Sequence, residues 1–109
     1  MVRRGDIVYV DLNPVIGSEQ GKTRPAVVIQ HDSLNKTSNT TIVVPITSRV
    51  YDKVYPMHVI LNTSTISGTI KTEQIRAIDI QRISSVVDSV NREVMNEIGI
   101  ALQKTCDFY

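Results

Sequence analysis

Two short segments rich in β-branched residues, 25–30 and 41–46, constrain the fold of this chain more than any other feature. The polar stretch 31–40 separates them, so the pattern predicts an antiparallel hairpin that turns around Asn35 and Lys36. When Val27 is set opposite Val44, one face of the hairpin becomes almost wholly apolar. That face pairs Pro25, Val27 and Ile29 with Ile46, Val44 and Ile42. A shift by one residue destroys this match, so the pattern favours this register.

The same register places two polar side chains opposite each other at the open end of the hairpin. Arg24 lies across from Thr47, and directly opposed Cβ atoms in a sheet are about 4.5–5.5 Å apart. A guanidinium and a hydroxyl would then share one small site. The face that carries them also presents Ala26, Val28, Val43 and Pro45. This set is too apolar to leave in water, so we expect the terminal helix or a second subunit to cover it.

The remaining pattern predicts a mainly β fold that ends in one helix. Residues 6–12 alternate as a strand does, residues 57–61 form another, and residues 69–78 form one or two more. The period then changes to that of a helix, with Asn91 as its N-cap and Val90 placed to pack onto Met95. We therefore expect a small, strongly bent β-barrel closed by a C-terminal α-helix, as a single domain over residues 1–109.

Composition excludes several classes of protein. The 109 residues are 41% hydrophobic and 21% charged with a net charge of +1, which is unlike a disordered tail or a polybasic nucleic-acid binder. A nucleic-acid ligand would need a local basic patch. No apolar run approaches the ~18–20 residues of a membrane span. Cys106 is the single cysteine, so no internal disulfide forms, and we expect a cytoplasmic protein.

The segment 13–23 predicts a long loop, which in a compact domain is more often functional than neutral. Its second half brings a carboxylate, an amide and a cation, from Glu19, Gln20 and Lys22, to the end of the hairpin where Arg24 lies. Taken alone, Arg24 would be interpreted as a surface arginine at the start of a strand. The polar loop beside it favours a binding or catalytic site.

These residues resemble the MazF/PemK family of toxin endoribonucleases. The resemblance rests on Gly17-Ser18-Glu19-Gln20-Gly21, on Arg24-Pro25, on Val44-Pro45-Ile46-Thr47, on Pro56-Met57-His58-Val59 and on Glu73-Gln74-Ile75-Arg76-Ala77-Ile78-Asp79. The N-terminal segment Arg4-Gly5-Asp6-Ile7-Val8, with Asp11-Leu12 and Pro14, matches as well. The matches run in the family's order over nearly the whole chain.

The resemblance implies an SH3-like barrel, a homodimer and a toxin restrained by a cognate antitoxin. It also implies cleavage of single-stranded RNA at short sequence motifs, by attack of the 2′-hydroxyl on the neighbouring phosphorus. Arg24 and Thr47 match the residues held to be catalytic in the family, and Glu19 is a candidate general base. We expect the RNA to be bound by Ser18, Gln20, Lys22, Arg49, Gln74 and Arg76.

The expected chemistry needs no metal and no other cofactor. Arg24 can grip two phosphate oxygens and offset the charge that develops on the phosphorus, and Thr47 can hold a phosphate oxygen or the 2′-hydroxyl. The sequence has no cluster of carboxylates that indicates a metal pair. Some relatives have a histidine where this chain has Thr23, while His31 is expected at the far end of the hairpin and His58 in a structural role. The general acid is therefore not assigned.

Two alternatives stay open on the sequence. Toxins of the same barrel class, the CcdB-like gyrase poisons, bind a protein and cut nothing, and they use their C-terminal helix, which here is followed by Phe108-Tyr109. The second alternative is an SH3-like adaptor that only binds. Fold alone does not distinguish the endoribonuclease from the gyrase poison or from the adaptor.

Overall fold

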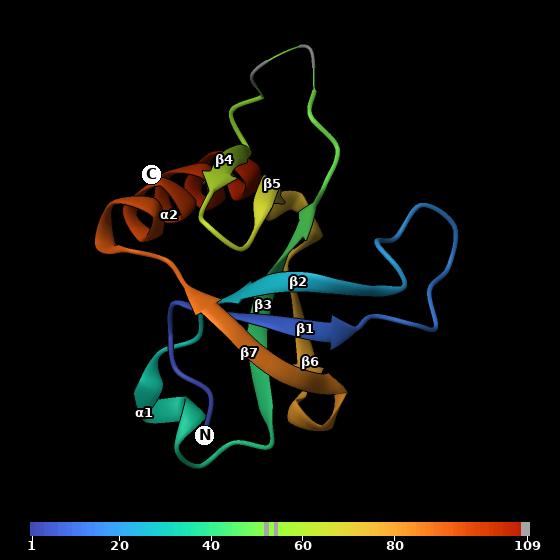
Figure 1. The fold of residues 1–109 in the computed structure, drawn as a ribbon, viewed down its shortest axis with the longest axis vertical. Coiled ribbons are helices and arrows are strands. Elements are labelled where there is room, and N and C mark those ends of the chain that lie inside the picture. Colours follow the sequence, from blue (N-terminus) through green and yellow to red (C-terminus); the bar gives the residue numbers. More distant parts are fainter. Residues whose placement is uncertain (52, 54, 108–109) are drawn as a thin grey trace.

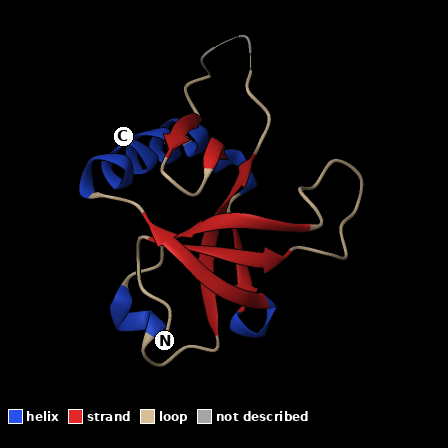
Figure 2. Ribbon diagram, in the orientation of Figure 1, coloured by secondary structure: helices blue, strands red, loops and turns tan. Residues whose placement is uncertain are grey.

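Seven β-strands among the described residues form one strongly bent antiparallel sheet, and a C-terminal helix lies against it (Figures 1 and 2). The structure is a computed structural model, and it describes residues 1–51, 53 and 55–107. The strands are β1 (Asp6–Asp11), β2 (Thr23–Val28), β3 (Thr40–Thr47), β4 (His58–Asn62), β5 (Ser67–Lys71), β6 (Arg76–Asp79) and β7 (Ile83–Ser89). The helices are α1 (Asp32–Asn35), the short 3-10 turns η1 (Thr72–Gln74) and η2 (Ile80–Arg82), and α2 (Arg92–Cys106).

The register predicted for β2 and β3 is confirmed. The two strands pair antiparallel with Ala26 opposite Pro45, Val27 opposite Val44 and Val28 opposite Val43. The pairing is not a simple hairpin, however, because α1 occupies the connection that was expected to turn around Asn35 and Lys36.

The short helix α1 ties this connection to the rest of the chain. His31 caps it, since its Nδ1 accepts from the backbone N–H of Ser33 at 3.0 Å. The Asp32 carboxylate accepts from the backbone N–H of Arg4 at 2.7 Å, and this hydrogen bond lowers the pKa of Asp32 below its usual value. The connection therefore carries structure that its polar composition did not predict.

Alternation along the strands divides the core into two clusters on opposite faces of the sheet. The cluster on one face contains Ile7, Val27, Val44 and Ile46, together with residues of β4, β5 and α2. The cluster on the other face contains Val8, Val10, Leu12, Ala26, Val28, Val43 and Ile78. Side chains at odd and even positions of one strand belong to different clusters, because successive side chains of a strand point to opposite faces of the sheet.

The second cluster corrects one sequence expectation. Ala26, Val28 and Val43 are completely buried within this single chain, and Pro45 is buried as well. The sheet covers that face itself because it curls round, so that β6 pairs with β3 while β7 pairs with β1. Neither the terminal helix nor a second subunit is needed there, and α2 covers the first cluster instead.

The C-terminal helix follows its predicted pattern. The Asn91 side chain accepts from the backbone N–H of Val94 at 2.9 Å, as an N-cap does. Met95, Ile98 and Ala101 are buried against the sheet, and Val90 packs onto the same cluster. Phe108 and Tyr109 lie outside the described residues. Within the described part of the chain, no helix has the length and apolar character to cross a membrane.

Candidate active site

The loop between β1 and β2 is held at both of its ends. At its base, the backbone N–H of Leu12 donates to the carbonyl of Lys22 at 3.0 Å, and the backbone N–H of Lys22 donates to the Asn13 side chain at 3.0 Å. Lys22 itself has a left-handed backbone, with φ of 65°. Arg76, expected to bind RNA, donates from Nη1 to the carbonyl of Leu12 at 3.2 Å, so here it braces the start of the loop.

The loop is also tied to the turn η1. The backbone N–H of Gln20 donates to Oε1 of Gln74 at 3.0 Å, across 54 residues of sequence. Ser18 and Glu19 are exposed in the same loop. The Glu19 carboxylate accepts from the backbone N–H of Ile16 at 2.6 Å, which closes a local turn. Two predicted site residues, Gln20 and Gln74, are thus in direct contact.

Arg24 lies half-buried near the start of β2, and neutral acceptors hold its guanidinium. Its Nε donates to the carbonyl of Gly21 at 2.8 Å. When the Gln20 amide presents its oxygen to the guanidinium, that oxygen accepts from Nη2 at 3.0 Å and from Nη1 at 3.1 Å. Among the described residues, no carboxylate forms an ion pair with Arg24. The charge of Arg24 is therefore positioned but not neutralised, which suits the binding of an anion.

Thr47 is the last residue of β3. The last β2–β3 pair is Ala26 with Pro45, so the predicted position of Arg24 opposite Thr47 lies beyond the paired residues and stays a prediction. On the opposite edge of β3 from β2, Ile46 and Thr47 pair with β5, so Thr47 lies opposite Thr69. Thr47 is only 8% exposed, and its Oγ1 accepts from the backbone N–H of Arg49 at 3.3 Å.

A glycine allows β5 to approach Thr47 closely. A Cβ built on Gly68 would lie 2.1 Å from the carbonyl oxygen of Thr47. Any other residue at this position must push the two strands apart. Gly68 thus fixes where the backbone of Thr47 lies relative to β5, a role that the sequence analysis missed.

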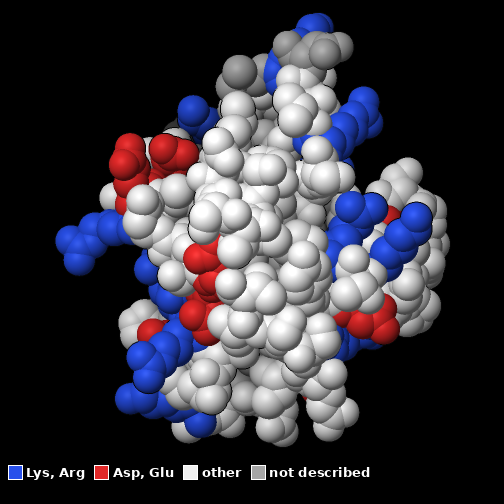
Figure 3. Space-filling model, viewed as in Figure 1, with Lys and Arg blue, Asp and Glu red and all other residues white. Residues whose placement is uncertain are grey.

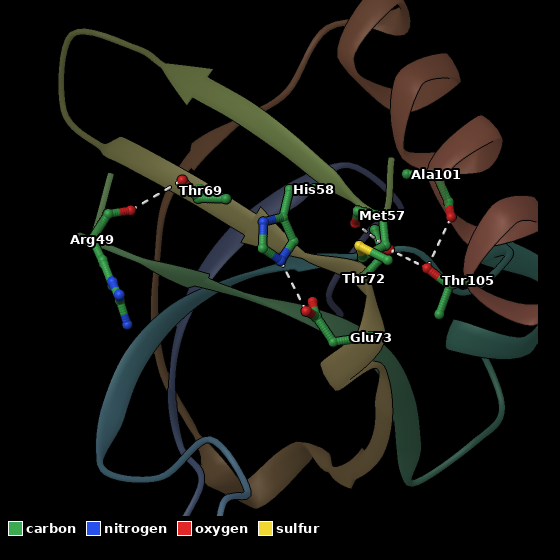
Figure 4. Close-up of polar contacts among 8 residues, drawn as sticks. All are labelled: Arg49, Met57, His58, Thr69, Thr72, Glu73, Ala101 and Thr105. Atoms are coloured by element: carbon green, nitrogen blue, oxygen red, sulfur yellow. Dashed lines mark hydrogen bonds and ion pairs between the residues drawn. The ribbon is translucent and has the colours of Figure 1, made fainter. Parts of the chain in front are cut away.

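Arg49 lies on the segment that follows β3. Its carbonyl accepts from Thr69 Oγ1 at 3.0 Å (Figure 4), and its guanidinium carbon lies 4.6 Å from the centre of the Tyr51 ring. Figure 3 shows basic side chains on the side of the molecule where the β1–β2 loop and the segment after β3 project, and others near the N-terminus. The basic residues are thus spread over this face, and one group of them lies beside the two projecting segments.

His58 has the structural position that the sequence predicted. Its ring is largely buried at the start of β4, and its Nε2 lies 2.8 Å from the Glu73 carboxylate (Figure 4). Glu73 precedes Gln74 in η1, so this contact also fixes the turn that holds Gln20. Among the described residues, no group of three or more His, Cys, Asp or Glu side chains is arranged to hold a metal ion.

The fold and the site define a small β-barrel protein with a preorganised arginine. The family model described as PemK-like, MazF-like toxin of type II toxin–antitoxin system matches residues 3–106. The chain is 40% identical over 107 residues to Endoribonuclease EndoA of Bacillus subtilis (strain 168), a match that covers 94% of this chain and 92% of that protein. The chain therefore belongs to the PemK-like, MazF-like family.

Solved structures agree with this assignment. MazF from Deinococcus radiodurans superposes with a TM-score of 0.88 at 27% identity, covering 98% of this chain and 97% of that one. A MazE–MazF structure from the same organism gives a TM-score of 0.79 at 25% identity, covering 99% and 97% of the two chains. These matches give no support to the gyrase-binding alternative.

Proposed function

We propose that this chain is the endoribonuclease toxin of a type II toxin–antitoxin system and that it cleaves single-stranded RNA without a metal ion. The observation that carries the proposal is the state of Arg24. Its guanidinium is fixed by the Gly21 carbonyl and the Gln20 amide, and it has no carboxylate partner among the described residues. The chain is similar to an endoribonuclease over nearly its whole length, and this similarity makes RNA the proposed substrate of the site around Arg24.

The proposed reaction is an internal transesterification. The 2′-hydroxyl oxygen forms a bond to the adjacent phosphorus, and the bond from phosphorus to the 5′-oxygen of the next nucleotide breaks. The products are a cyclic phosphate and a 5′-hydroxyl, with the proton of the 2′-hydroxyl balanced by the one that the leaving oxygen gains. Because the nucleophile is the 2′-hydroxyl, DNA at the scissile position is inert.

The residues act on the charge and the alignment of the phosphate. Arg24 donates to the non-bridging oxygens, where negative charge grows in the transition state. Thr47 Oγ1 holds a phosphate oxygen or the 2′-hydroxyl in line, and Glu19 is the candidate general base within the loop. We propose that Ser18, Gln20, Lys22 and Arg49 contact the RNA, while Gln74 and Arg76 act by fixing the loop.

The partners follow from the same proposal. We propose a cognate antitoxin because a MazF relative of 25% identity has been solved together with MazE. We also propose a homodimer in the cytoplasm. Ile60 on β4 is 70% exposed and Ile100 on α2 is 53% exposed, and both border one groove between these elements, which supplies an apolar surface for a second copy.

A direct test incubates the purified protein with a long single-stranded RNA in excess EDTA. We expect discrete fragments, because the Arg24 guanidinium supplies positive charge at the phosphate and no metal ion is needed. Addition of Mg²⁺ should not increase the rate. Intact RNA in EDTA, together with cleavage that appears only when Mg²⁺ is added, would contradict the proposal.

A further inference from the structure

The turn η1 depends on other elements for its orientation. It has only three residues, Thr72–Gln74, and no side chain caps its start at Lys71. A 3-10 turn of this length has little stability of its own, because its hydrogen-bond geometry is poor. The contacts of its three side chains, with α2, with β4 and with the β1–β2 loop, therefore determine how it lies.

The first of these side chains, Thr72, joins the turn to α2. Thr72 is completely buried, and its backbone N–H donates to the carbonyl of Met57 at 3.3 Å. Its Oγ1 lies 2.8 Å from the Oγ1 of Thr105, in the last turn of α2 (Figure 4). A buried hydroxyl that loses its partner costs free energy, so this contact holds α2 and η1 together.

The hydroxyl hydrogens can link the two elements in two ways, because each threonine has one such hydrogen. In the first, Thr105 donates to Thr72, which donates onward to the Met57 carbonyl. In the second, Thr72 donates to Thr105, which donates onward to the Ala101 carbonyl. A hydrogen lies between the two threonine oxygens in both. Removal of either hydroxyl therefore breaks the link between α2 and η1.

The middle residue, Glu73, holds the turn to β4. Its carboxylate lies 2.8 Å from Nε2 of His58, and Met57, which Thr72 contacts, directly precedes His58. These two contacts reach the same short segment, so the turn can still pivot about it. Thr105 supplies a point of attachment on a different element.

The last residue of η1 transmits this position to Arg24. Oε1 of Gln74 accepts from the backbone N–H of Gln20 at 3.0 Å. Gln20 precedes Gly21, whose carbonyl accepts from Nε of Arg24 at 2.8 Å. The side-chain oxygen of Gln20 accepts from the same guanidinium. A displacement of Gln74 therefore moves both of the neutral acceptors that fix Arg24.

We propose that Thr72 and Thr105 are positioning residues for Arg24, so that the last turn of α2 sets the orientation of the Arg24 guanidinium through η1. The inference rests on the proposed function. Neither threonine touches the RNA, and both act through Gln74 and the β1–β2 loop. A small misplacement that originates far from the reacting atoms is enough to lower a rate.

Thr105→Val removes the hydroxyl and keeps the shape of the side chain. We expect the single-turnover rate at saturating protein to fall about two- to ten-fold, as for one hydrogen bond between neutral groups, while the affinity for RNA is unchanged. Thr105→Ser restores the hydroxyl and should recover the rate. Thr41→Val is the matched control, because Thr41 is completely buried and its hydroxyl donates to Asn35 Oδ1 in α1 at 2.8 Å. It should lower the stability in urea without lowering the rate.

The Arg24 Nε–H signal in ¹H–¹⁵N spectra reports on the guanidinium without requiring cleavage, and its loss in Arg24→Lys assigns it. We expect Thr105→Val to shift this signal, and Thr105→Ser and Thr41→Val to leave it in place. An unmoved signal or a full single-turnover rate in Thr105→Val, or an equal shift in Thr41→Val, would overturn the proposal. If the natural protein leaves RNA intact, the proposed function fails, and the Arg24 signal alone decides whether α2 positions this side chain.

Discussion

At the scale of single residues, the central observation is how Arg24 is held. Neutral acceptors fix the guanidinium without neutralising it, so that its positive charge remains available to bind an anion. A surface arginine of ordinary kind would be exposed and unrestrained. The hydrogen bond from Gln20 to Gln74 ties the loop that holds Arg24 to η1, and the His58–Glu73 pair holds η1 in place.

Arg24→Ala should therefore lower the rate of RNA cleavage by about 10²–10³, the loss measured when one preorganised donor to a developing oxyanion is removed. Arg24→Lys should recover little of this, because an ammonium cannot make the planar, paired contact. Rates are measured under single-turnover conditions in EDTA. Lys36→Ala, an exposed residue at the end of α1, is the control for lost positive charge. Full activity in a folded Arg24→Ala protein would show that the site lies elsewhere.

At the scale of elements, the site depends on how closely β5 approaches the end of β3. Gly68 and Gly99 provide a matched pair of glycines for testing this. A Cβ at Gly68 would lie 2.1 Å from the Thr47 carbonyl oxygen, whereas a Cβ at Gly99 in α2 meets nothing within 4 Å.

Gly68→Ala should destabilise the protein by about 1–3 kcal/mol, as overpacking does, and should reduce cleavage because Thr47 is displaced. Gly99→Ala should stabilise it by up to about 1 kcal/mol, since alanine favours a helix more than glycine does. Urea unfolding and cleavage rates measure both. If Gly68→Ala unfolds and cleaves as the natural protein does, then the close approach of β5 has no role at Thr47.

The elements also show what the sequence could predict. Strand pairing of β2 with β3 followed from their runs of β-branched residues and from the apolar match across them, and α2 followed from its period and its cap at Asn91. Strand β7 was missed because Val86 and Val87 are exposed and no alternation marks it. The helix α1 has four residues, too few to show a period.

The candidate site was predicted in the same uneven way. Arg24 and Thr47 were proposed from the register of β2 and β3, and the pairs observed between these strands end at Ala26 and Pro45. The bracing role of Arg76 and the contact of Gln20 with Gln74 depend on side-chain geometry across the barrel, which no local pattern encodes. The contact of Thr72 with Thr105 likewise forms only when α2 packs beside η1.

At the scale of the whole molecule, the sheet buries both of its faces within one chain, so a dimer is not needed to complete the core. The exposed Ile60 and Ile100 remain outside it. We predict a dimer in sedimentation velocity at micromolar concentration, and a shift toward monomer in the double variant Ile60→Ser, Ile100→Ser. A monomeric natural protein with full cleavage activity would rule out a dimer as a requirement for function.

The central claim is that the RNA supplies its own nucleophile while Arg24 stabilises the charge on the phosphorus. The most direct test uses a short RNA that spans one mapped cleavage site, with a single 2′-deoxy nucleotide on the 5′ side of the scissile phosphate, in EDTA. We expect the unmodified RNA to be cut to a product with a 5′-hydroxyl, and the deoxy RNA to stay intact while it binds with similar affinity. Cleavage of the deoxy RNA, or a product with a 5′-phosphate, would contradict the account.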